Sequence, residues 1–154
     1  MVVLMCEAAG GRLAILVRDV VEVIARPHLQ PLAGKPDWFA GLFAYRGRVT
    51  PVVELGRLMD GDVRPPMWSN RIVVVRVRET AAESGREKLV GLLVDRAAAE
   101  PMDEQVLNPA GDSANRVVPW GATRLDDRGM FCALELTSVL TPERLLALFP
   151  GEHG

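Results

Sequence analysis

The chain has 154 residues, of which 49% are hydrophobic, and its formal net charge is −2. This length favours one domain with a substantial core, and the near-neutral charge argues against a nucleic-acid-binding protein. No apolar run approaches the ~18 residues of a membrane span, and no signal peptide is recognisable, so we expect a cytoplasmic protein without direct membrane insertion.

Apolar runs separated by Gly and Pro turns predict a series of short strands. The first two, over 4–8 and 12–17, form a hairpin around Gly10-Gly11. Residues 20–24 form a strand or a short helix, and prolines then mark a loop that ends in a helical turn at 37–40.

The segment Gly41-Leu42-Phe43-Ala44-Tyr45-Arg46-Gly47-Arg48-Val49-Thr50-Pro51-Val52-Val53-Glu54-Leu55 predicts a hairpin. Gly47 supplies the positive φ that a tight turn requires. Val49, Val52 and Val53 suit a half-buried strand, and Pro51 marks a strand edge or a bulge. The segment contains no nucleophile or metal-ligand set, which directs the functional search towards binding.

Further strands are predicted over 71–78, 89–94 and 130–136, with loops over 79–88 and 101–116. The sequence Thr141-Pro142-Glu143 then predicts a helix start, because Thr is a good N-cap and Pro suits the first helical position. Many short strands and one late helix favour a mainly β fold with one or two barrels.

Two pairs of segments recur in the same order. Arg46-Gly47 before Glu54-Leu55 resembles Arg128-Gly129 before Glu135-Leu136, and 12–17 resembles 88–94. The recurrence indicates an internal duplication with two lobes.

Catalytic and metal chemistry has no visible basis in this sequence. Cys6 and Cys132 lie in apolar runs typical of buried thiols, and His28 lies alone in a Pro-rich loop. No nucleophile elbow, phosphate loop or metal-ligand spacing is present, so we expect no enzyme, no cofactor and no metal site.

Glu22 lies within the β-branched run Val20-Val21-Glu22-Val23-Ile24. If it is buried it needs a partner, and the guanidinium of Arg46 is the natural candidate. The alternative is that Glu22 faces water. The residues alone leave both open.

The order of these blocks resembles the CheW family of chemotaxis coupling proteins. The matching segments are 20–24, 41–47, 49–55, 71–75, 90–95 and 130–136, which span nearly the whole chain. Flanking residues such as Trp38 and the closing Leu148-Phe149-Pro150 also resemble coupling proteins of Wsp-type surface-sensing pathways.

The resemblance implies a mainly β, CheW-like fold of two small five-stranded β-barrel lobes packed side by side, with a C-terminal helix. Residues 1–150 then form a single domain: lobe 1 is approximately 18–78, lobe 2 approximately 1–17 plus 79–140, and the helix 141–149.

The resemblance also implies a non-catalytic adaptor. Its expected partners are the regulatory domain of a CheA-type histidine kinase and the cytoplasmic tip of a methyl-accepting chemoreceptor, held between the lobes. Glu22 and Arg46 are expected to form a partly buried ion pair. The expected partner-binding residues are Val20, Glu22, Gly41, Arg46, Gly47, Ile72, Val73, Gly91 and Asp95.

The chain departs from the family pattern where Glu54 and Glu135 replace an Asp, and at Ala97 to Glu100, which weakens the expected edge of lobe 2. Two alternatives remain: a scaffold of the same fold that links a kinase to a non-chemotaxis output, and a β-barrel sensor of small ligands. The sensor would need an enclosed apolar cavity with a few convergent polar groups.

Overall fold

The computed structural model describes residues 1–62, 64–77, 87–109 and 118–151. Its strands are β1 (Val2–Ala8), β2 (Gly11–Leu16), β3 (Val20–Ala25), β4 (Phe39–Tyr45), β5 (Arg48–Glu54), β6 (Arg71–Val77), β7 (Lys88–Val94), β8 (Arg96–Pro101), β9 (Gly121–Asp126) and β10 (Gly129–Leu134). Its helices are α1 (Leu55–Asp60), α2 (Glu104–Leu107), α3 (Leu136–Val139) and α4 (Pro142–Leu148), with a 3-10 turn, η1, at Val17–Asp19.

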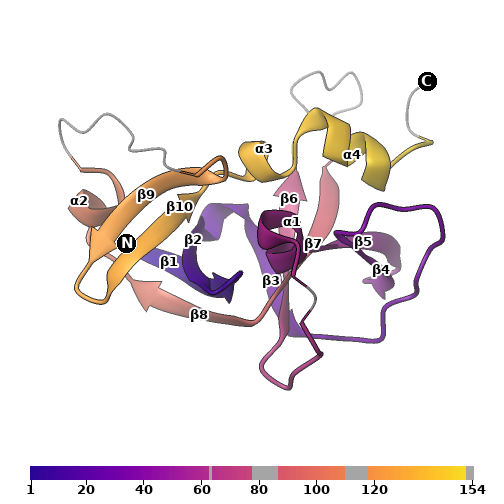
Figure 1. Ribbon diagram of the computed structural model, residues 1–154, viewed down its shortest axis with the longest axis horizontal. Helices are drawn as coiled ribbons and strands as arrows, with labels where there is room; N and C mark the ends of the chain where they lie inside the picture. The colour runs from indigo at the N-terminus through magenta and orange to yellow at the C-terminus, as the bar shows by residue number, and fades with distance from the viewer. Residues whose placement is uncertain (63, 78–86, 110–117, 152–154) are drawn as a thin grey trace.

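The strands form two five-stranded sheets that lie side by side (Figure 1). The sheet of lobe 1 has the order β3-β6-β7-β5-β4, and that of lobe 2 the order β8-β1-β2-β10-β9. In both, a parallel contact joins the central pair to the closing hairpin: β7 to β5 in lobe 1, and β2 to β10 in lobe 2. The lobes therefore share one topology, and β2 and β7 hold the same place in it, as the predicted duplication requires.

One boundary between the lobes differs from the expectation. Residues 79–140 were expected in lobe 2, yet β7 pairs with β6 and β5 of lobe 1. The chain crosses to lobe 2 only at Asp95, whose N–H donates to the carbonyl of Glu7 at 2.8 Å. β7 therefore belongs to lobe 1, where it lies between β6 and β5 in the sheet. The predicted loop at 79–88 lies mostly outside the described residues.

The central strands are buried on both faces, and their alternating side chains supply three apolar layers. The first layer lies between the sheets and draws Val73, Val75 and Leu92 from lobe 1 and Leu4, Cys6 and Ile15 from lobe 2. A second layer fills lobe 1 with residues such as Ile72, Val74 and Phe43. A third fills lobe 2 with Val3, Met5, Ala14 and Phe131. Every second residue of β1 or β6 thus contributes to the layer that the lobes share.

The hydrogen-bonded sheets do not close into complete barrels, in contrast to the expectation. In lobe 1 the segment that connects β3 to β4 folds back on β4 through an isolated bridge, in which Gln30 and Leu42 exchange backbone hydrogen bonds of 2.8 and 2.9 Å. Gly41 permits this approach, because an added Cβ would lie 2.9 Å from both the Gln30 carbonyl oxygen and the Leu29 Cβ.

Several local predictions differ from the structure. The predicted loop over 101–116 contains the short helix α2. The segment expected to form a helical turn at 37–40 instead leads into β4, because the Glu54 N–H already donates to the Trp38 carbonyl and pairs it with β5. Strands β8 and β9 were not predicted. Ala97, Ala98 and Ala99 have little strand propensity. They are extended because they pair with β1 in an antiparallel ladder.

The C-terminal helix begins where its capping pattern predicts. The hydroxyl of Thr141 accepts a hydrogen bond from the Arg144 N–H, and Pro142 opens α4. Leu148 of α4 packs on the layer between the lobes, and both α3 and α4 run along one side of the molecule (Figure 1). Among the described residues, no helix is long and apolar enough to cross a membrane.

Both cysteines are buried, as expected. Cys6 on β1 and Cys132 on β10 are both in register with Leu13 of the intervening strand β2. Burial raises the pKa of the Cys6 thiol to about 12, so it stays protonated at neutral pH.

The packing of lobe 1 makes a prediction at Gly91. A Cβ at this position would lie 2.7 Å from Ile72 Cγ2 and 3.1 Å from Val52 Cγ2. We expect Gly91→Ala to lower the free energy of unfolding by about 1–3 kcal/mol through overpacking, measured by urea denaturation. Gly11→Ala is the matched strand control, because its Cβ would meet only the Ala8 carbonyl at 3.9 Å. Equal stability of the two variants would contradict this packing.

Candidate functional site

A β-bulge in β3 sets the position of Glu22. The register between β3 and β6 shifts between Val20 and Glu22, so Val20 packs on the layer between the lobes and Val21 on the core of lobe 1. Glu22 then lies opposite Val74, on the interior face of lobe 1 at the rim of its core. A carboxylate at such a rim needs donors from the facing strand.

The hairpin of β4 and β5 supplies those donors. Arg46 and Gly47 form its two-residue turn with φ values of 48° and 77°, the left-handed conformation that such turns require. Just before the turn, Tyr45 is buried and its hydroxyl donates a hydrogen bond to Glu22 Oε1. Arg46 Nη2 donates to the same oxygen at 2.9 Å. Together these bonds join β3 to β4, the two outer strands of lobe 1.

The pair is more exposed than expected. The side chain of Arg46 is 68% exposed and that of Glu22 is 39% exposed. The Arg46 guanidinium also lies 5.1 Å from the centroid of the Tyr45 ring, and the two groups form a cation–π contact. Burial, followed by the hydrogen bond to Glu22, raises the pKa of Tyr45, so the phenol remains a donor. Tyr45, a residue that the sequence analysis did not assign to the site, is therefore the buried donor to Glu22, and Arg46 is the exposed one.

Four of the expected partner-binding residues lie in the interior. Ile72 and Val73 are 0% exposed, and Gly91 is buried against Ile72 and Val52. Gly41 is buried where residues 29 and 30 cross β4. They shape the core of lobe 1 and its closure. The segments that contain these residues are apolar because they are core strands. An apolar binding groove would give the same sequence pattern, so the sequence could not distinguish the two.

The remaining expected residues lie on or near the surface. Arg46 and Gly47 are exposed, and Glu22 and Val20 are half-buried. The Glu22–Arg46 ion pair brings β3 to the β4–β5 turn, whereas Val20 packs on the layer between the lobes. Asp95 lies apart, where the chain crosses to lobe 2. There its carboxylate is 3.8 Å from Arg64, which also reaches Asp60 at 3.4 Å. The group of Glu22, Arg46 and Gly47, with the buried Tyr45 beneath them, is called the lobe 1 rim below.

Lobe 2 has an equivalent rim that the sequence analysis missed. Arg128, in the turn between β9 and β10, forms an ion pair with Glu100 of the outer strand β8. The recurrence of Arg46-Gly47 at Arg128-Gly129 indicates an equivalent turn in lobe 2. The partner of Arg128 was not predicted, because the sequence does not mark β8 as a strand. In both lobes an arginine of the closing hairpin thus reaches a glutamate of the opposite outer strand.

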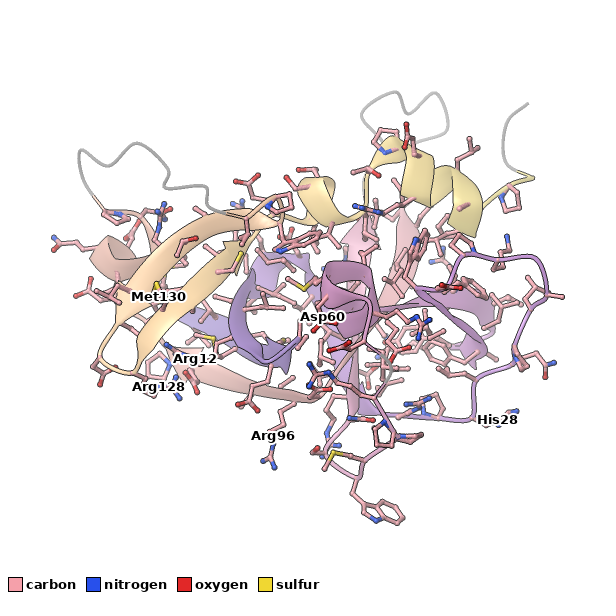
Figure 2. The ribbon with its side chains drawn as sticks, in the orientation of Figure 1. Arg12, His28, Asp60, Arg96, Arg128 and Met130 are labelled. Carbon is pink, nitrogen blue, oxygen red and sulfur yellow. The ribbon has the colours of Figure 1, made fainter. Side chains whose placement is uncertain are left out.

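A second ion pair supports the lobe 2 hairpin. Arg12 of β2 donates two hydrogen bonds to Asp126, at 2.7 and 2.8 Å, and a third to the carbonyl of Gly129 at 3.0 Å. Figure 2 shows Arg12 and Arg128 at this hairpin. The two side chains of the Arg12–Asp126 pair are only 16% and 12% exposed. The hydrogen bonds from Arg12 lower the pKa of Asp126 to about 2, and the backbone N–H of Arg128 adds to the effect.

The unequal burial of the two donors to Glu22 gives a prediction. Tyr45→Phe should lower the free energy of unfolding by about 1–2 kcal/mol, because it removes a buried hydrogen bond. Arg46→Ala should cost at most about 1 kcal/mol, because the pair is exposed to solvent. Urea denaturation of both variants tests this order. A larger loss for Arg46→Ala would show that the arginine, and not the tyrosine, anchors the carboxylate.

The Arg12–Asp126 pair predicts a pH dependence. The pKa of Asp126 is lower in the folded chain than in the unfolded chain, so its contribution is complete above about pH 4 and is lost as the pH falls towards 2. At pH 7 we expect Asp126→Asn to lower the free energy of unfolding by about 2 kcal/mol. The difference from wild type should shrink below pH 4. The neighbouring, exposed Asp127→Asn is the control, and a pH-independent loss in Asp126→Asn would rule out the ion pair as its source.

Comparison with known proteins agrees with this architecture. The crystal structure of the scaffolding protein TtCheW from Thermoanaerobacter tengcongensis is similar to this chain with a TM-score of 0.73 and 19% sequence identity, over 93% of this chain and 89% of that one. No curated protein matches the chain. The family model of the CheW-like domain matches residues 2–147. The chain therefore belongs to the CheW-like domain family.

Proposed function

We propose that this protein is a non-catalytic adaptor that couples the cytoplasmic tip of a chemoreceptor to a CheA-type histidine kinase. Membership of the CheW-like family over residues 2–147 carries the proposal. The adaptor acts in the cytoplasm and reaches the membrane only through its receptor.

The lobe 1 rim is the proposed contact for the receptor tip. Glu22 engages one nitrogen of the Arg46 guanidinium, so the remaining N–H groups of this exposed side chain are free to donate to a partner. The turn conformation, the Tyr45 ring and Glu22 together hold the guanidinium in one place, which reduces the entropy lost on binding. The rim thus presents a fixed cation whose loss hardly affects folding.

Cavities in the described residues do not favour the small-ligand sensor. The interior of each lobe is filled by its own apolar layer. A hollow of about 290 Å³ lies between the β4–β5 hairpin and Phe149, but the charged residues Arg48, Glu87 and Lys88 line it. Another, lined by Arg26, Glu54 and Asp95 among others, has a volume of only about 10 Å³. A packed interior favours the adaptor over the small-ligand sensor.

Calorimetric titration of the purified kinase regulatory domain and of a receptor-tip fragment, both from the same host, tests the proposal. We expect each to bind wild type with micromolar Kd, equivalent to about −8 kcal/mol. Absence of binding by both partners at tens of micromolar would contradict the adaptor function.

A matched pair of variants tests the rim. Arg46→Ala should weaken receptor-tip binding about tenfold or more, with unchanged binding of the kinase domain. Arg96→Ala is the control, because the Arg96 side chain is similarly exposed, at 69%, and also pairs with a glutamate, Glu7. Figure 2 shows Arg96 on β8, in lobe 2. Equal effects of the two substitutions would remove the rim from the receptor site.

A further inference from the structure

The parallel ladder between β5 and β7 is short. It pairs only residues 52–54 with 91–93, although both strands begin several residues earlier. Pro51 accounts for this late start. Leu42, which is opposite Pro51 in β4, directs its N–H and its carbonyl to Gln30, so the backbone of Pro51 faces β7 instead. Proline has no N–H to donate, and the two strands are therefore not paired before residue 52.

A hollow of about 290 Å³ lies beside this unpaired stretch. Val49 of β5, Leu89 of β7 and Phe149, which follows α4, give it an apolar lining. Two cations line the same hollow. The side chain of Arg48 is exposed, whereas Lys88 is only 9% exposed and its Nζ lies 4.9 Å from the centroid of the Phe149 ring. The hollow therefore combines an apolar wall with one buried and one exposed positive charge.

The charge and the size of the hollow limit what it can accept. Glu87 is the one acidic residue among the described residues that line it, and its carboxylate lies 3.6 Å from Arg76 Nε. The excess charge is therefore positive, which favours an anionic group. Small-molecule sites usually have volumes of about 300–1,000 Å³, so this open hollow suits one or two side chains rather than a cofactor.

The two lobes can be aligned through their parallel ladders. Val52 of β5 and Ala133 of β10 are each the fifth residue of their strand, and they pair with Gly91 of β7 and Ala14 of β2. In lobe 2 the ladder also includes the preceding residue of β10, Cys132, which has the N–H that a proline lacks. The gap in lobe 1 therefore has a direct counterpart at the same place in lobe 2.

Lobe 2 fills that place with one of its own side chains. Two residues before the aligned partners, lobe 2 has Arg12 where lobe 1 has Leu89. The Arg12 guanidinium donates to the carbonyls of Gly129 and Met130 in β10, at 3.0 and 3.4 Å, and its charge is balanced by Asp126. Leu89 has no group that can form such bonds, and the hollow lies open at this place in lobe 1.

We propose that the hollow binds an acidic side chain of an extended peptide from another protein. The carboxylate lies between Arg48 and Lys88, so lobe 1 takes from a partner the ionic group that lobe 2 supplies itself, with the opposite charge. The backbone of Val49 faces the same side of β5 as that of Pro51, so its N–H and carbonyl can pair with the extended chain. Apolar neighbours of the acidic residue pack on Phe149. The site adjoins the lobe 1 rim but uses other residues, and the inference does not rest on the proposed adaptor function.

Calorimetric titration of the full chain with three blocked pentapeptides tests the site. The first peptide alternates Val and Glu, and in the other two either Gln or Lys replaces each Glu. We expect the Glu peptide to bind with a Kd of about 1 mM or lower, and the other two at least about tenfold more weakly. Raising the salt concentration from about 0.05 to about 0.5 M should weaken binding of the Glu peptide, because salt screens exposed charges.

Two pairs of variants locate the bound peptide. Arg48→Gln should raise the Kd about fivefold or more. Arg96→Gln, which changes an arginine that is 69% exposed on β8 of lobe 2, should leave the Kd unchanged. Val49→Trp should abolish binding, because Val49 is 73% exposed and a larger side chain fills the hollow without disturbing the core. Met130→Trp is its control, since Met130 is 72% exposed and, like Val49, is the second residue of its strand.

Each outcome supports or overturns the inference. Absence of binding by the Glu peptide at about 10 mM would overturn it, and so would equal affinity for all three peptides. A control variant that weakens binding as much as its matched variant rules out the hollow as the location. Urea denaturation should give wild type and all four variants the same midpoint. If Val49→Trp lowers the midpoint, Arg48→Gln and the salt dependence decide the location. The titrations with the kinase domain and the receptor tip test the adaptor function separately.

Discussion

A single apolar layer between two sheets determines most of this structure. Because side chains alternate along a strand, β1, β2, β6 and β7 each give one face to this shared layer and the other to the interior of their own lobe. Neither lobe can be removed without exposing the Val73–Leu92 face of one sheet and the Leu4–Ile15 face of the other. The two lobes are therefore one folded unit. For an adaptor, such a unit fixes the distance and orientation between surfaces that bind different partners.

Polar side chains link the outer strands of each lobe, which the apolar layers do not join. Each lobe is an incomplete barrel whose outer strands do not form a continuous ladder, and in each an arginine from the closing hairpin reaches a glutamate on the opposite outer strand. The two closures have different neighbours. Lobe 1 adds a buried tyrosine to the glutamate, whereas lobe 2 adds the well-buried Arg12–Asp126 pair to its hairpin. The two lobes share one strand order, and the side chain of Arg46 is the more exposed of the two arginines, at 68% against 52% for Arg128.

The fold was predictable where the sequence has an apolar run, a glycine turn or a helix cap. The hairpin around Arg46-Gly47, the strand at 71–77 and the capped helix after Thr141 follow from such local signals. Strands β8 and β9 did not, because Ala97–Ala99 and Gly121–Asp126 become extended only through pairing with β1 and β10. The site was predictable in part. A resemblance placed Glu22 beside Arg46. Apolar patterning cannot separate a core strand from a binding groove, and Ile72, Val73 and Gly91, which were expected to bind a partner, are buried.

The claim on which this account depends most is that the lobes fold and open together. Native-state hydrogen exchange measures it directly, because the amides of β1 and β2 report on lobe 2 and those of β6 and β7 on lobe 1. The account predicts that the most protected amides of both pairs share one opening free energy and one urea dependence, equal to those of global unfolding. An opening that exposes β1 and β2 while β6 and β7 stay protected would contradict a shared core, and with it the fixed arrangement of the two lobes.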